Sequence, residues 1–371
     1  MSAARKPRVA VVFGGRSSEH AVSCATAASV LSVIDRDVYD VVPVGITVDG
    51  KWVLESGEAS RLALTAGHVP QVDARASAVS LSTDPQRHDL VVSEPGQLPR
   101  ALGEVDVVFP LLHGPWGEDG TIQGLFEMAG VRYVGSGVLA SAVAMDKHYM
   151  RIVLAAAALP MTRYLVVRAS EWRDDPAAVR ETVDALGYPV FVKPARGGSS
   201  LGISKALTSD DLDAAIAHAQ EFDPKVLVER AVEGGRELEC AVLQRPDGGA
   251  GASVVAEITG YGDHDFYDFE AKYLAEEGVT LKVPASLRPE VRADVQRLAV
   301  TAFEAIGGEG LARVDFFLEH GGRLLVNEIN TMPGFTPASM YPRLWAESGV
   351  GYPELVDRLL RLAMARTTGL R

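Results

Sequence analysis

The chain has 371 residues, of which 47% are hydrophobic and 23% charged, and its formal net charge is −13 at pH 7. This length permits two or three domains with a large core, and the composition is typical of a globular enzyme. The acidic balance argues against general nucleic-acid binding, which needs a basic face. Local clusters of Lys, Arg and backbone N–H groups can still bind anionic ligands.

The N-terminal segment, the lengths of the apolar runs and the cysteines indicate where in the cell the protein is found. The basic N-terminus leads directly into RVAVVFGG, which is too short for the apolar region of a signal peptide. We find no uninterrupted run of about 18 apolar residues, so we expect no membrane span and no membrane partner. Cys24 and Cys240 lie in unrelated segments, which favours a reducing environment. We therefore expect a soluble, cytoplasmic protein.

The first predicted unit is a strand, a glycine turn and a helix. Arg8–Phe13 is an apolar run typical of a buried parallel strand, and GGRSSEH then leads into the helix-like AVSCATAASVLSVI. The dinucleotide fingerprint GxGxxG is absent, which argues against a nicotinamide dehydrogenase. We expect Ser17 or Ser18 to cap the helix, with Glu19 in its first turn. There Glu19 either compensates the helix dipole or faces a cationic ligand.

A second buried strand ends at a histidine. Asp40–Val48 and Lys51–Leu54 are expected to form a hairpin around an Asp-Gly turn, and residues 67–104 to form surface strands and loops. Val105–Leu112 is the next buried strand, followed by HGPWGEDG and a helix. A lone histidine is more often structural, but His113 lies at the carboxyl end of a strand, where ligands of α/β proteins bind.

The middle of the chain contains a glycine-rich loop between two strands. Ser141–Ala158 is predicted to be one helix that contains Lys147. A strand with Lys193 then runs into ARGGSSLG and a second strand, without the GK[ST] ending of a Walker loop. Such a loop can fold its N–H groups and hydroxyls over phosphates, or it is a plain hairpin loop. The preceding Lys193 favours phosphate binding.

Two acids follow in neighbouring strands. Lys225–Arg230 is a predicted strand containing Glu229, and Glu237 begins the next strand. The pair could bind an adenine amino group and ribose hydroxyls, or it could consist of two surface acids. Further helices are predicted over Asp210–Gln220, Arg288–Ile306 and Tyr352–Ala365.

Residues 311–334 are predicted to form a β-hairpin with one polar face. Because strand side chains alternate, Arg313 and Asp315 share a face of the first strand, and Glu328 and Asn330 share a face of the second. Carboxylates and a carboxamide suit Mg²⁺, which proteins usually hold by one or two carboxylates together with substrate phosphates. The alternative is a solvated sheet face with an Arg–Asp pair.

The order of motifs along the whole chain, from Val9 to about Leu362, resembles the D-alanine–D-alanine ligases of the ATP-grasp superfamily. The hairpin alone would indicate only an ATP-grasp enzyme, whereas the N-terminal motifs are more specific. The motifs are FGGRSSEHAVS, LLHGPWGEDGTIQG, MDK, FVKPARGGSSLGISK, VLVER, GRELE, DFEAKY, RVDFF and NEINTMPGFTPASM.

The resemblance implies an α/β (α+β ATP-grasp) fold with three domains. These are an N-terminal parallel α/β substrate domain at 1–135, a central ATP-grasp lid domain at 136–230 and a C-terminal catalytic domain at 231–371. The implied activity is the ATP-dependent ligation of two D-alanines to D-alanyl-D-alanine through D-alanyl phosphate, for peptidoglycan precursors. ATP is the co-substrate, two Mg²⁺ or Mn²⁺ ions are required, and a homodimer is expected.

By resemblance, most of the ATP site comes from the middle of the chain. Lys147 and Lys193 resemble the lysines that reach the α- and β-phosphates, and Lys272 the one on the γ-phosphate side. Glu229 resembles the acid near adenine and Glu237 the acid that binds ribose. The full set of ATP-binding residues is Lys147, Lys193, Ser199, Ser200, Glu229, Val232, Glu237 and Lys272.

The metal and oxyanion positions fall in the hairpin. Asp315, Glu328 and Asn330 resemble the ligands of two metal ions that bridge the phosphates. Arg313 and the backbone N–H of Gly334 resemble an oxyanion hole. The resemblance therefore favours the metal-binding interpretation of this hairpin.

Both amino-acid sites are implied in the same way. Glu19 would hold the ammonium of the first D-alanine, with His113 near its carboxylate. Ser339 and the N–H of Met340 would receive the carboxylate of the second D-alanine. Ser199 and Tyr273 would link to Glu19 by hydrogen bonds. The catalytic residues implied are Glu19, Ser199, Tyr273, Arg313 and Gly334.

One departure and two alternatives accompany this assignment. The Gly234-Gly235-Arg236 stretch is a residue longer than in some relatives, which affects the hinge between Glu229 and Glu237. One alternative is a D-alanine–D-lactate ligase, but such variants alter the loop with Lys272 and Tyr273, whereas this chain keeps EAKY. The other is a non-catalytic nucleotide-binding regulator on an ATP-grasp scaffold, against which the intact set of metal and phosphate residues argues.

Overall fold

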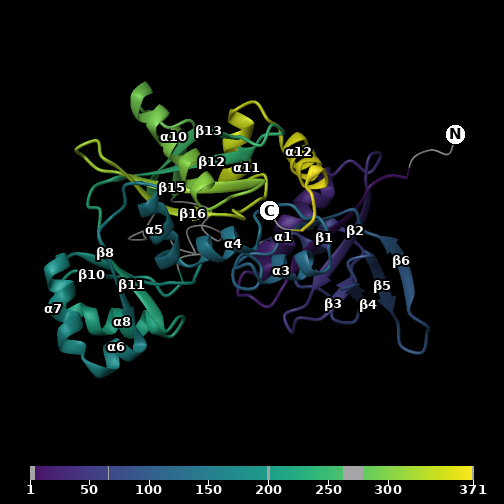
Figure 1. Ribbon diagram of the computed structural model, residues 1–371, viewed down its shortest axis with the longest axis horizontal. Helices are drawn as coiled ribbons and strands as arrows, with labels where there is room; N and C mark the ends of the chain where they lie inside the picture. The colour runs from purple at the N-terminus through teal and green to yellow at the C-terminus, as the bar shows by residue number, and fades with distance from the viewer. Residues whose placement is uncertain (1–4, 66, 199–200, 262–278, 370–371) are drawn as a thin grey trace.

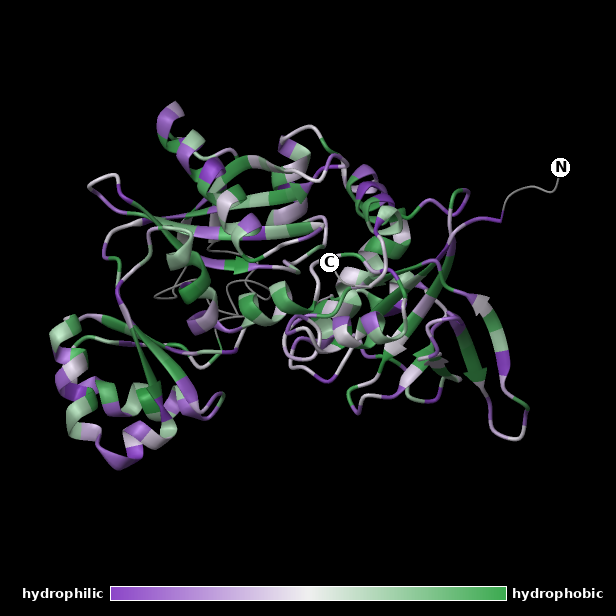
Figure 2. Ribbon diagram, viewed as in Figure 1, coloured by the Kyte–Doolittle hydropathy of each residue, from purple (hydrophilic) through white to green (hydrophobic). Residues whose placement is uncertain are grey.

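The protein's structure is a computed structural model that describes residues 5–65, 67–198, 201–261 and 279–369. Figure 1 shows three lobes, each built around one sheet, with the N-terminal lobe at the right and the teal middle segment at the lower left. Figure 2 shows hydrophobic residues concentrated along the strands. In the part of the chain described, no helix combines the length and apolarity needed to cross a bilayer.

The N-terminal sheet combines parallel and antiparallel strands. Among the described residues its order is β6-β5-β4-β3-β2-β1-β7, and β1 pairs in parallel with both β2 and β7. Val9 to Phe13 are at most 1% exposed, because helices cover both faces of this parallel region. The strands are β1 (Arg8–Gly14), β2 (Asp40–Ile46), β3 (Trp52–Leu54), β4 (Ala78–Leu81), β5 (Asp89–Ser93), β6 (Arg100–Glu104) and β7 (Val107–Pro110).

The predicted strand–turn–helix and hairpin are present in this lobe. The strand β2 pairs antiparallel with β3 across the predicted Asp-Gly turn, in which Gly50 has φ +89°. The capping prediction was wrong, since Glu19 itself is the N-cap of α1 and its side chain makes no cap hydrogen bond. Ser17 instead donates its hydroxyl to the carbonyl of His113, 2.6 Å away. The helices are α1 (His20–Val33), α2 (Ala59–Leu62) and α3 (Thr121–Met128).

The middle sheet is antiparallel, with the order β10-β9-β11-β8 among the described residues. Valines such as Val190, Val192 and Val228 pack on α7 and α8 in a core separate from the other lobes. The predicted helix at 210–220 begins as a 3₁₀ turn, Ser209–Asp211, before α8. The elements are β8 (Tyr164–Arg168), α6 (Ala169–Asp174), α7 (Pro176–Leu186), β9 (Val190–Pro194), β10 (Ser204–Ala206), α8 (Leu212–Gln220) and β11 (Lys225–Arg230).

The third sheet is antiparallel and is covered by helices on both faces. Its described order is β14-β13-β12-β15-β16. On β12, Leu238, Cys240 and Val242 pack into the core that contains α10, whereas Ala241 and Leu243 join the core that contains α11 and α12. The elements are β12 (Arg236–Gln244), β13 (Ala250–Tyr261), β14 (Val279–Lys282), α10 (Pro289–Ala305), β15 (Leu311–Leu318), β16 (Leu324–Asn330), α11 (Met340–Glu347) and α12 (Tyr352–Ala365).

The predicted single helix at 141–158 is two helices, α4 (Val138–Met145) and α5 (Lys147–Ala156). Asp146 between them has extended backbone angles, and its carboxylate accepts hydrogen bonds from the N–H groups of His148 and Tyr149. The N–H of Lys147 donates to the carbonyl of Ala195, 2.8 Å away. Aspartate favours such a cap over a helix interior, so the helix restarts here and Lys147 becomes the first residue of α5.

Candidate active site

A cavity of about 520 Å³ lies between the middle and third sheets and is lined at one end by loops of the N-terminal lobe. Strands β9 and β11 supply one wall, and β12, β15 and β16 supply the other. Most of the predicted site residues line it together: Glu19, His113, Lys147, Lys193, Glu229, Val232, Glu237, Arg313, Asp315, Glu328, Asn330 and Gly334.

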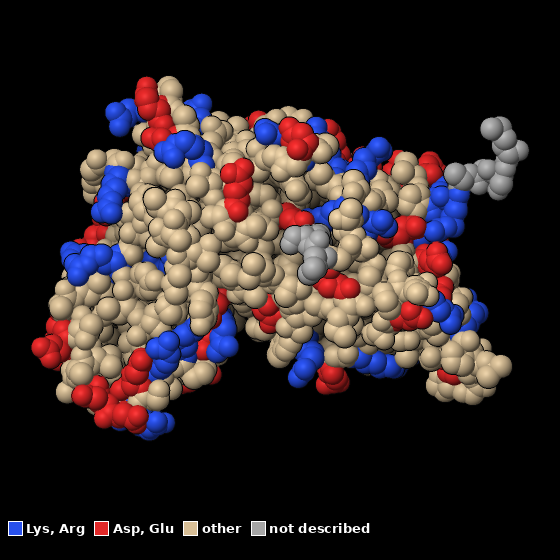
Figure 3. Space-filling model, viewed as in Figure 1, with Lys and Arg blue, Asp and Glu red and all other residues tan. Residues whose placement is uncertain are grey.

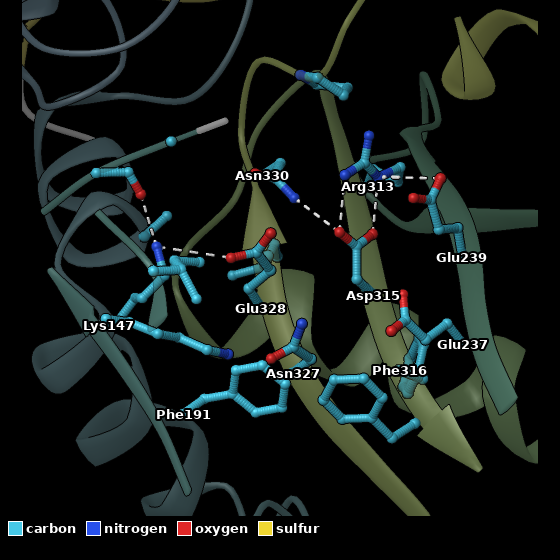
Figure 4. Close-up of a pocket in the computed structure, with 18 of the residues that line it drawn as sticks. Lys147, Phe191, Glu237, Glu239, Arg313, Asp315, Phe316, Asn327, Glu328 and Asn330 are labelled. Atoms are coloured by element: carbon cyan, nitrogen blue, oxygen red, sulfur yellow. Dashed lines mark hydrogen bonds and ion pairs between the residues drawn. The ribbon is translucent and has the colours of Figure 1, made fainter. Parts of the chain in front are cut away.

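The β15–β16 hairpin presents its polar face to this cavity, as the alternation of residues predicts. Arg313 lies opposite Asn330 and Asp315 opposite Glu328, with a register shift immediately after Asp315. The carboxylate of Asp315 accepts two hydrogen bonds of 2.7 Å from Arg313 and one of 3.2 Å from the amide nitrogen of Asn330. Figure 4 shows these side chains together on one face of the hairpin.

Arg313 has a second acidic partner that the sequence did not reveal. Glu239 lies opposite Asp315 on the neighbouring strand β12, and its carboxylate is 3.3 Å from the Nε of Arg313. Glu239 is only 4% exposed. Burial disfavours the guanidinium charge, but the charges of Asp315 and Glu239 raise the pKa of Arg313 well above its ordinary value. Arg313 is therefore a fixed positive charge in this wall.

Lys147 connects the glycine loop to the hairpin. From the start of α5 its ammonium donates to the carbonyl of Gly197 at 2.7 Å and lies 3.6 Å from the carboxylate of Glu328 (Figure 4). A lysine at this point can interact with an anion that enters between the loop and Glu328. This position agrees with the phosphate role implied for Lys147.

The hairpin fits a magnesium site in its donor chemistry. Asp315 and Glu328 supply two carboxylates and Asn330 a carboxamide, all hard oxygen donors at one wall of the cavity. The described residues contain no cluster of three or more His, Cys, Asp or Glu side chains that would hold a metal by themselves. Mg²⁺ is usually bound by one or two carboxylates together with substrate phosphates, which is the arrangement this set permits.

The opposite wall contains a buried group of three charges. Glu229 is only 2% exposed. One of its carboxylate oxygens accepts a hydrogen bond of 2.5 Å from Lys193, and the other forms an ion pair with Arg151. Arg151 was missed in the sequence, where it belongs to an ordinary amphipathic helix. Burial alone would raise the pKa of Glu229, but the charges of Lys193 and Arg151 lower it, so the carboxylate is ionised.

Glu19 and His113 lie at the N-terminal end of the cavity, 6% and 5% exposed. Gly114 has φ +74°, and a Cβ on it would approach a carboxylate oxygen of Glu19 to 2.6 Å, so this position requires glycine. A Cβ on Gly198 would lie 3.5 Å from Glu19, which places the glycine loop over this carboxylate. Both side chains line the same cavity, each a few residues beyond the carboxyl end of a parallel strand.

His113 is held between a hydroxyl and a carboxylate. One ring nitrogen is 3.3 Å from the hydroxyl of Thr26, and the other is 3.7 Å from a carboxylate oxygen of Glu118. Burial disfavours the charged imidazole, but the carboxylate of Glu118, together with the charge of Glu19, raises the pKa of His113. The raised pKa favours the charged imidazole, which can attract a carboxylate.

Comparisons with known proteins agree over the full chain. Residues 8–136 match the family described as D-ala D-ala ligase N-terminus, and residues 153–361 match D-ala D-ala ligase C-terminus. The chain belongs to the D-alanine–D-alanine ligase family. A D-alanine–D-alanine ligase from Streptomyces griseus subsp. griseus is 57% identical and one from an Arthrobacter species 56% identical, each aligned over 99% of this chain and 95% and 96% of the relative.

Solved structures show the same fold. The D-Ala:D-Ser ligase VanG from Enterococcus faecalis is 34% identical, with a TM-score of 0.83 over 97% of this chain and 100% of that one. The D-alanine–D-alanine ligase from Coxiella burnetii is 30% identical, with a TM-score of 0.80 over 97% and 94%. The predicted ATP-grasp fold and ligase class are confirmed.

Two predicted substrate residues of this ligase lie just outside the cavity lining. Ser339 is the N-cap of α11, and its hydroxyl accepts a hydrogen bond of 3.1 Å from the N–H of Thr336. The same hydroxyl would lie 3.1 Å from a Cβ on Gly334, which does line the cavity. Met340 follows as the first residue of α11, with its side chain buried. The remaining predicted positions, Ser199, Ser200, Lys272 and Tyr273, lie outside the described residues.

The cavity of the ligase contains several cationic side chains although the chain as a whole is acidic. Figure 3 shows acidic and basic side chains mixed over one face of a chain whose net charge is −13. Within the cavity, Lys147, Lys193 and Arg313 are joined by Lys205 on β10, whose ammonium is 6.0 Å from the ring centre of Phe191. Lys205 was also missed in the sequence. These cations make the cavity suitable for a polyanion despite the acidic surface.

Proposed function

We propose that this ligase joins two D-alanine molecules to D-alanyl-D-alanine while ATP is converted to ADP and phosphate, for peptidoglycan precursors. The observation that carries the proposal is the cavity, which brings lysines, a carboxylate-rich hairpin and the Glu19–His113 pair together. D-alanine–D-alanine ligases 57% and 56% identical over 99% of the chain favour this activity over both alternatives. A cytoplasmic location and a homodimer are part of the proposal.

The three domains are proposed at 1–135, 136–230 and 231–371, with the cavity between the second and third. Each range contains one of the three described sheets. Helix α5, within the second range, contributes Met150 and Leu154 to the core of the third sheet. The helix therefore ties Lys147 to the wall that contains the hairpin.

The first chemical step activates a carboxylate. A free carboxylate is a poor acyl donor, because an attacking amine would have to expel oxide from it. The carboxylate of the first D-alanine therefore attacks the γ-phosphorus of ATP, forming D-alanyl phosphate and ADP. Lys147 and Lys193 hold the phosphates in line, and Glu229 and Glu237 receive adenine and ribose, with Val232 beside them. Two Mg²⁺ or Mn²⁺ ions held by Asp315, Glu328 and Asn330 would supply charge neutralisation for the triphosphate.

The second step forms the peptide bond. The neutral amine of the second D-alanine attacks the acyl carbon, and the oxygen of the resulting tetrahedral intermediate becomes negative. That oxyanion is stabilised by the guanidinium of Arg313 and the N–H of Gly334, both of which line the cavity. The attacking nitrogen becomes positively charged when it bonds to the acyl carbon. It loses a proton and the intermediate expels phosphate, which gives the neutral peptide bond.

The two amino acids are proposed to bind at the end nearest the N-terminal lobe. Glu19 pairs with the ammonium of the first D-alanine and His113 attracts its carboxylate. Ser339 and the N–H of Met340 receive the carboxylate of the second. Water would hydrolyse the acyl phosphate, so Gly198 and the loop after it are proposed to cover the site, with Ser199 and Tyr273 hydrogen-bonded to Glu19.

The test is phosphate release from ATP with D-alanine, L-alanine, D-serine and D-lactate assayed in parallel near neutral pH. We expect release that depends on D-alanine, with D-alanyl-D-alanine as the product identified by mass spectrometry. Predominant product with D-lactate or D-serine would assign the second site to that substrate. ATP binding without any D-alanine-dependent phosphate release would contradict the proposal in favour of a nucleotide-binding regulator.

A further inference from the structure

Glu229 has one cation on each carboxylate oxygen, and the two cations differ in their surroundings. Lys193 donates to one oxygen at 2.5 Å, and its side chain lines the cavity. Arg151 pairs with the other oxygen, is 1% exposed and does not belong to the cavity lining. The carboxylate thus has one partner that a ligand can reach and one that it cannot.

Arg151 is fixed by three neighbouring segments. It projects from α5 and pairs with Glu229 of β11. Its Nη1 donates to the carbonyl and the hydroxyl of Thr162, at 3.2 and 3.0 Å. The guanidinium carbon also lies 4.9 Å from the ring centre of Tyr164, which opposes Glu229 in the β8–β11 register. These contacts hold the guanidinium on several sides, outside the lining of the cavity.

We infer that Arg151 is the permanent counter-ion of Glu229 and that it allows Lys193 to transfer from Glu229 to the phosphates of ATP. The inference rests on the proposed phosphate role of Lys193. If Lys193 were the sole partner, its departure would leave a buried carboxylate unpaired, which is strongly unfavourable. With Arg151 in place, Glu229 stays ionised after Lys193 has moved, so the transfer requires no proton.

The charges around Glu229 support this division of roles. Two cations and one anion leave this group with one excess positive charge, which attracts the phosphates. Glu328, across the cavity, also acts on Glu229, and its negative charge opposes ionisation of Glu229. Without Arg151, Glu229 would either retain Lys193 against the phosphates or take up a proton when Lys193 leaves.

The experiment is calorimetric titration of folded protein with Mg·ATP, without D-alanine, in two buffers of different ionisation enthalpy. The variants are R151M, R151K and K193M. We expect R151M to bind ATP about tenfold or more weakly and to take up a fraction of a proton on binding, unlike wild type. R151K should restore most of the affinity and abolish the proton uptake, because the charge returns. Adenosine affinity, which needs no lysine transfer, should change little in R151M.

Arg366 provides a matched control. Its side chain is 9% exposed, is 3.7 Å from Glu309 and donates to the carbonyls of Tyr133 and Gly135 at 3.0 and 2.7 Å, away from the cavity. R366M should lower stability without changing ATP affinity or proton uptake. If R151M does not fold, R151Q replaces it, because a neutral amide can still donate to Glu229; the same loss of affinity and proton uptake are expected.

The outcomes distinguish the role of Lys193 from that of Arg151. Unchanged ATP affinity in K193M would contradict the proposed phosphate role of Lys193 itself. Weak ATP binding in K193M, together with wild-type affinity and no proton uptake in R151M, would overturn the counter-ion role of Arg151 alone. Equal weakening of ATP and adenosine binding in R151M would also overturn it, because a general distortion of the wall would then explain the effect.

Discussion

Asp315 and Arg313, two residues apart on β15, form a bidentate ion pair with both hydrogen bonds at 2.7 Å. Their spacing places them on the same face of the strand, which lines the cavity, and the register with β16 shifts immediately after Asp315. Arg313 also contacts Glu239, so the guanidinium keeps a carboxylate partner if Asp315 turns toward a metal ion. The pair thus joins the proposed metal site to the proposed oxyanion site.

Asp315→Asn and Glu328→Gln should leave the fold intact and reduce turnover by about 10²–10³-fold, the usual loss when one interaction with developing charge is removed. The reason is that each amide keeps the size of the side chain but loses the negative charge that would bind Mg²⁺. The measurement is the initial rate at saturating ATP and D-alanine, with circular dichroism to confirm folding. Asp247→Asn, in an exposed turn, is the control and should retain the wild-type rate. Near-normal turnover in a folded D315N or E328Q protein would remove that residue from the proposed ligands.

Glu19→Gln should weaken the apparent affinity for the first D-alanine about tenfold or more, while ATP binding is retained. The amide keeps the shape but loses a charge-assisted contact to the ammonium, and about 1.4 kcal/mol corresponds to a tenfold change. The second D-alanine should be affected less, because its carboxylate is proposed to bind Ser339 and the Met340 N–H. The measurement is the initial rate against D-alanine concentration, fitted with two separate constants.

The competing role of Glu19 is compensation of the α1 dipole, which would cost about 0.3–1 kcal/mol of stability and little else. Asp175 is a suitable control, because it is the N-cap of α7 and accepts a hydrogen bond of 3.0 Å from the N–H of Ala178. Asp175→Asn should affect stability only. If E19Q behaves like D175N, with both D-alanine constants unchanged, Glu19 is structural.

His113 should give stability a defined pH dependence. Its pKa is raised in the folded state, against burial, by Glu118 and Glu19, so protonation favours folding. This contribution is fully present below the ordinary pKa of about 6.5 and is lost as the pH rises through the higher folded pKa. The difference in unfolding free energy between wild type and His113→Gln should therefore be larger at about pH 6 than at about pH 8, as measured by urea denaturation.

Glu118→Gln is the companion variant, since it removes the negative charge of the carboxylate that lies 3.7 Å from the His113 ring. The imidazole should then titrate at a lower pH, which proton NMR of the ring can follow. A stabilising contribution of His113 that increases with pH would show that the neutral ring is favoured in the folded protein, contrary to this expectation.

Asp146→Ala should destabilise the ligase by about 0.5–2 kcal/mol for the lost helix cap, and somewhat more because Lys225 loses its partner. Asp146→Asn should cost less, because the amide oxygen can still accept from the N–H of His148. Urea denaturation measures both variants. We expect the free energy of unfolding to be lowest for D146A, intermediate for D146N and highest for wild type. Equal stability of D146A and wild type would mean that the break between α4 and α5 needs no cap.

Local rules were sufficient for the elements that hold most of the site. Alternation along β15 and β16 predicted that Arg313, Asp315, Glu328 and Asn330 would share one wall. The rule that ligands bind at the carboxyl ends of parallel strands made His113 a candidate despite the commoner structural role of a lone histidine. The family resemblance, confirmed over the full chain, then assigned a reaction to these residues.

Tertiary structure decided which charges neutralise one another. Arg151 and Glu229 are 78 residues apart, and nothing in the periodicity of α5 distinguishes this arginine from a solvent-exposed one. Glu239 became a partner of Arg313 only through the β12–β15 register. Asp146, where the predicted helix is interrupted, is approached by Arg196 and Lys225 from other segments. Strand alternation and helix periodicity depend on neighbours along the chain, so the sequence determined the faces of these elements. The partner of a buried charge depends on which distant segment packs against it, and only the folded chain determines that.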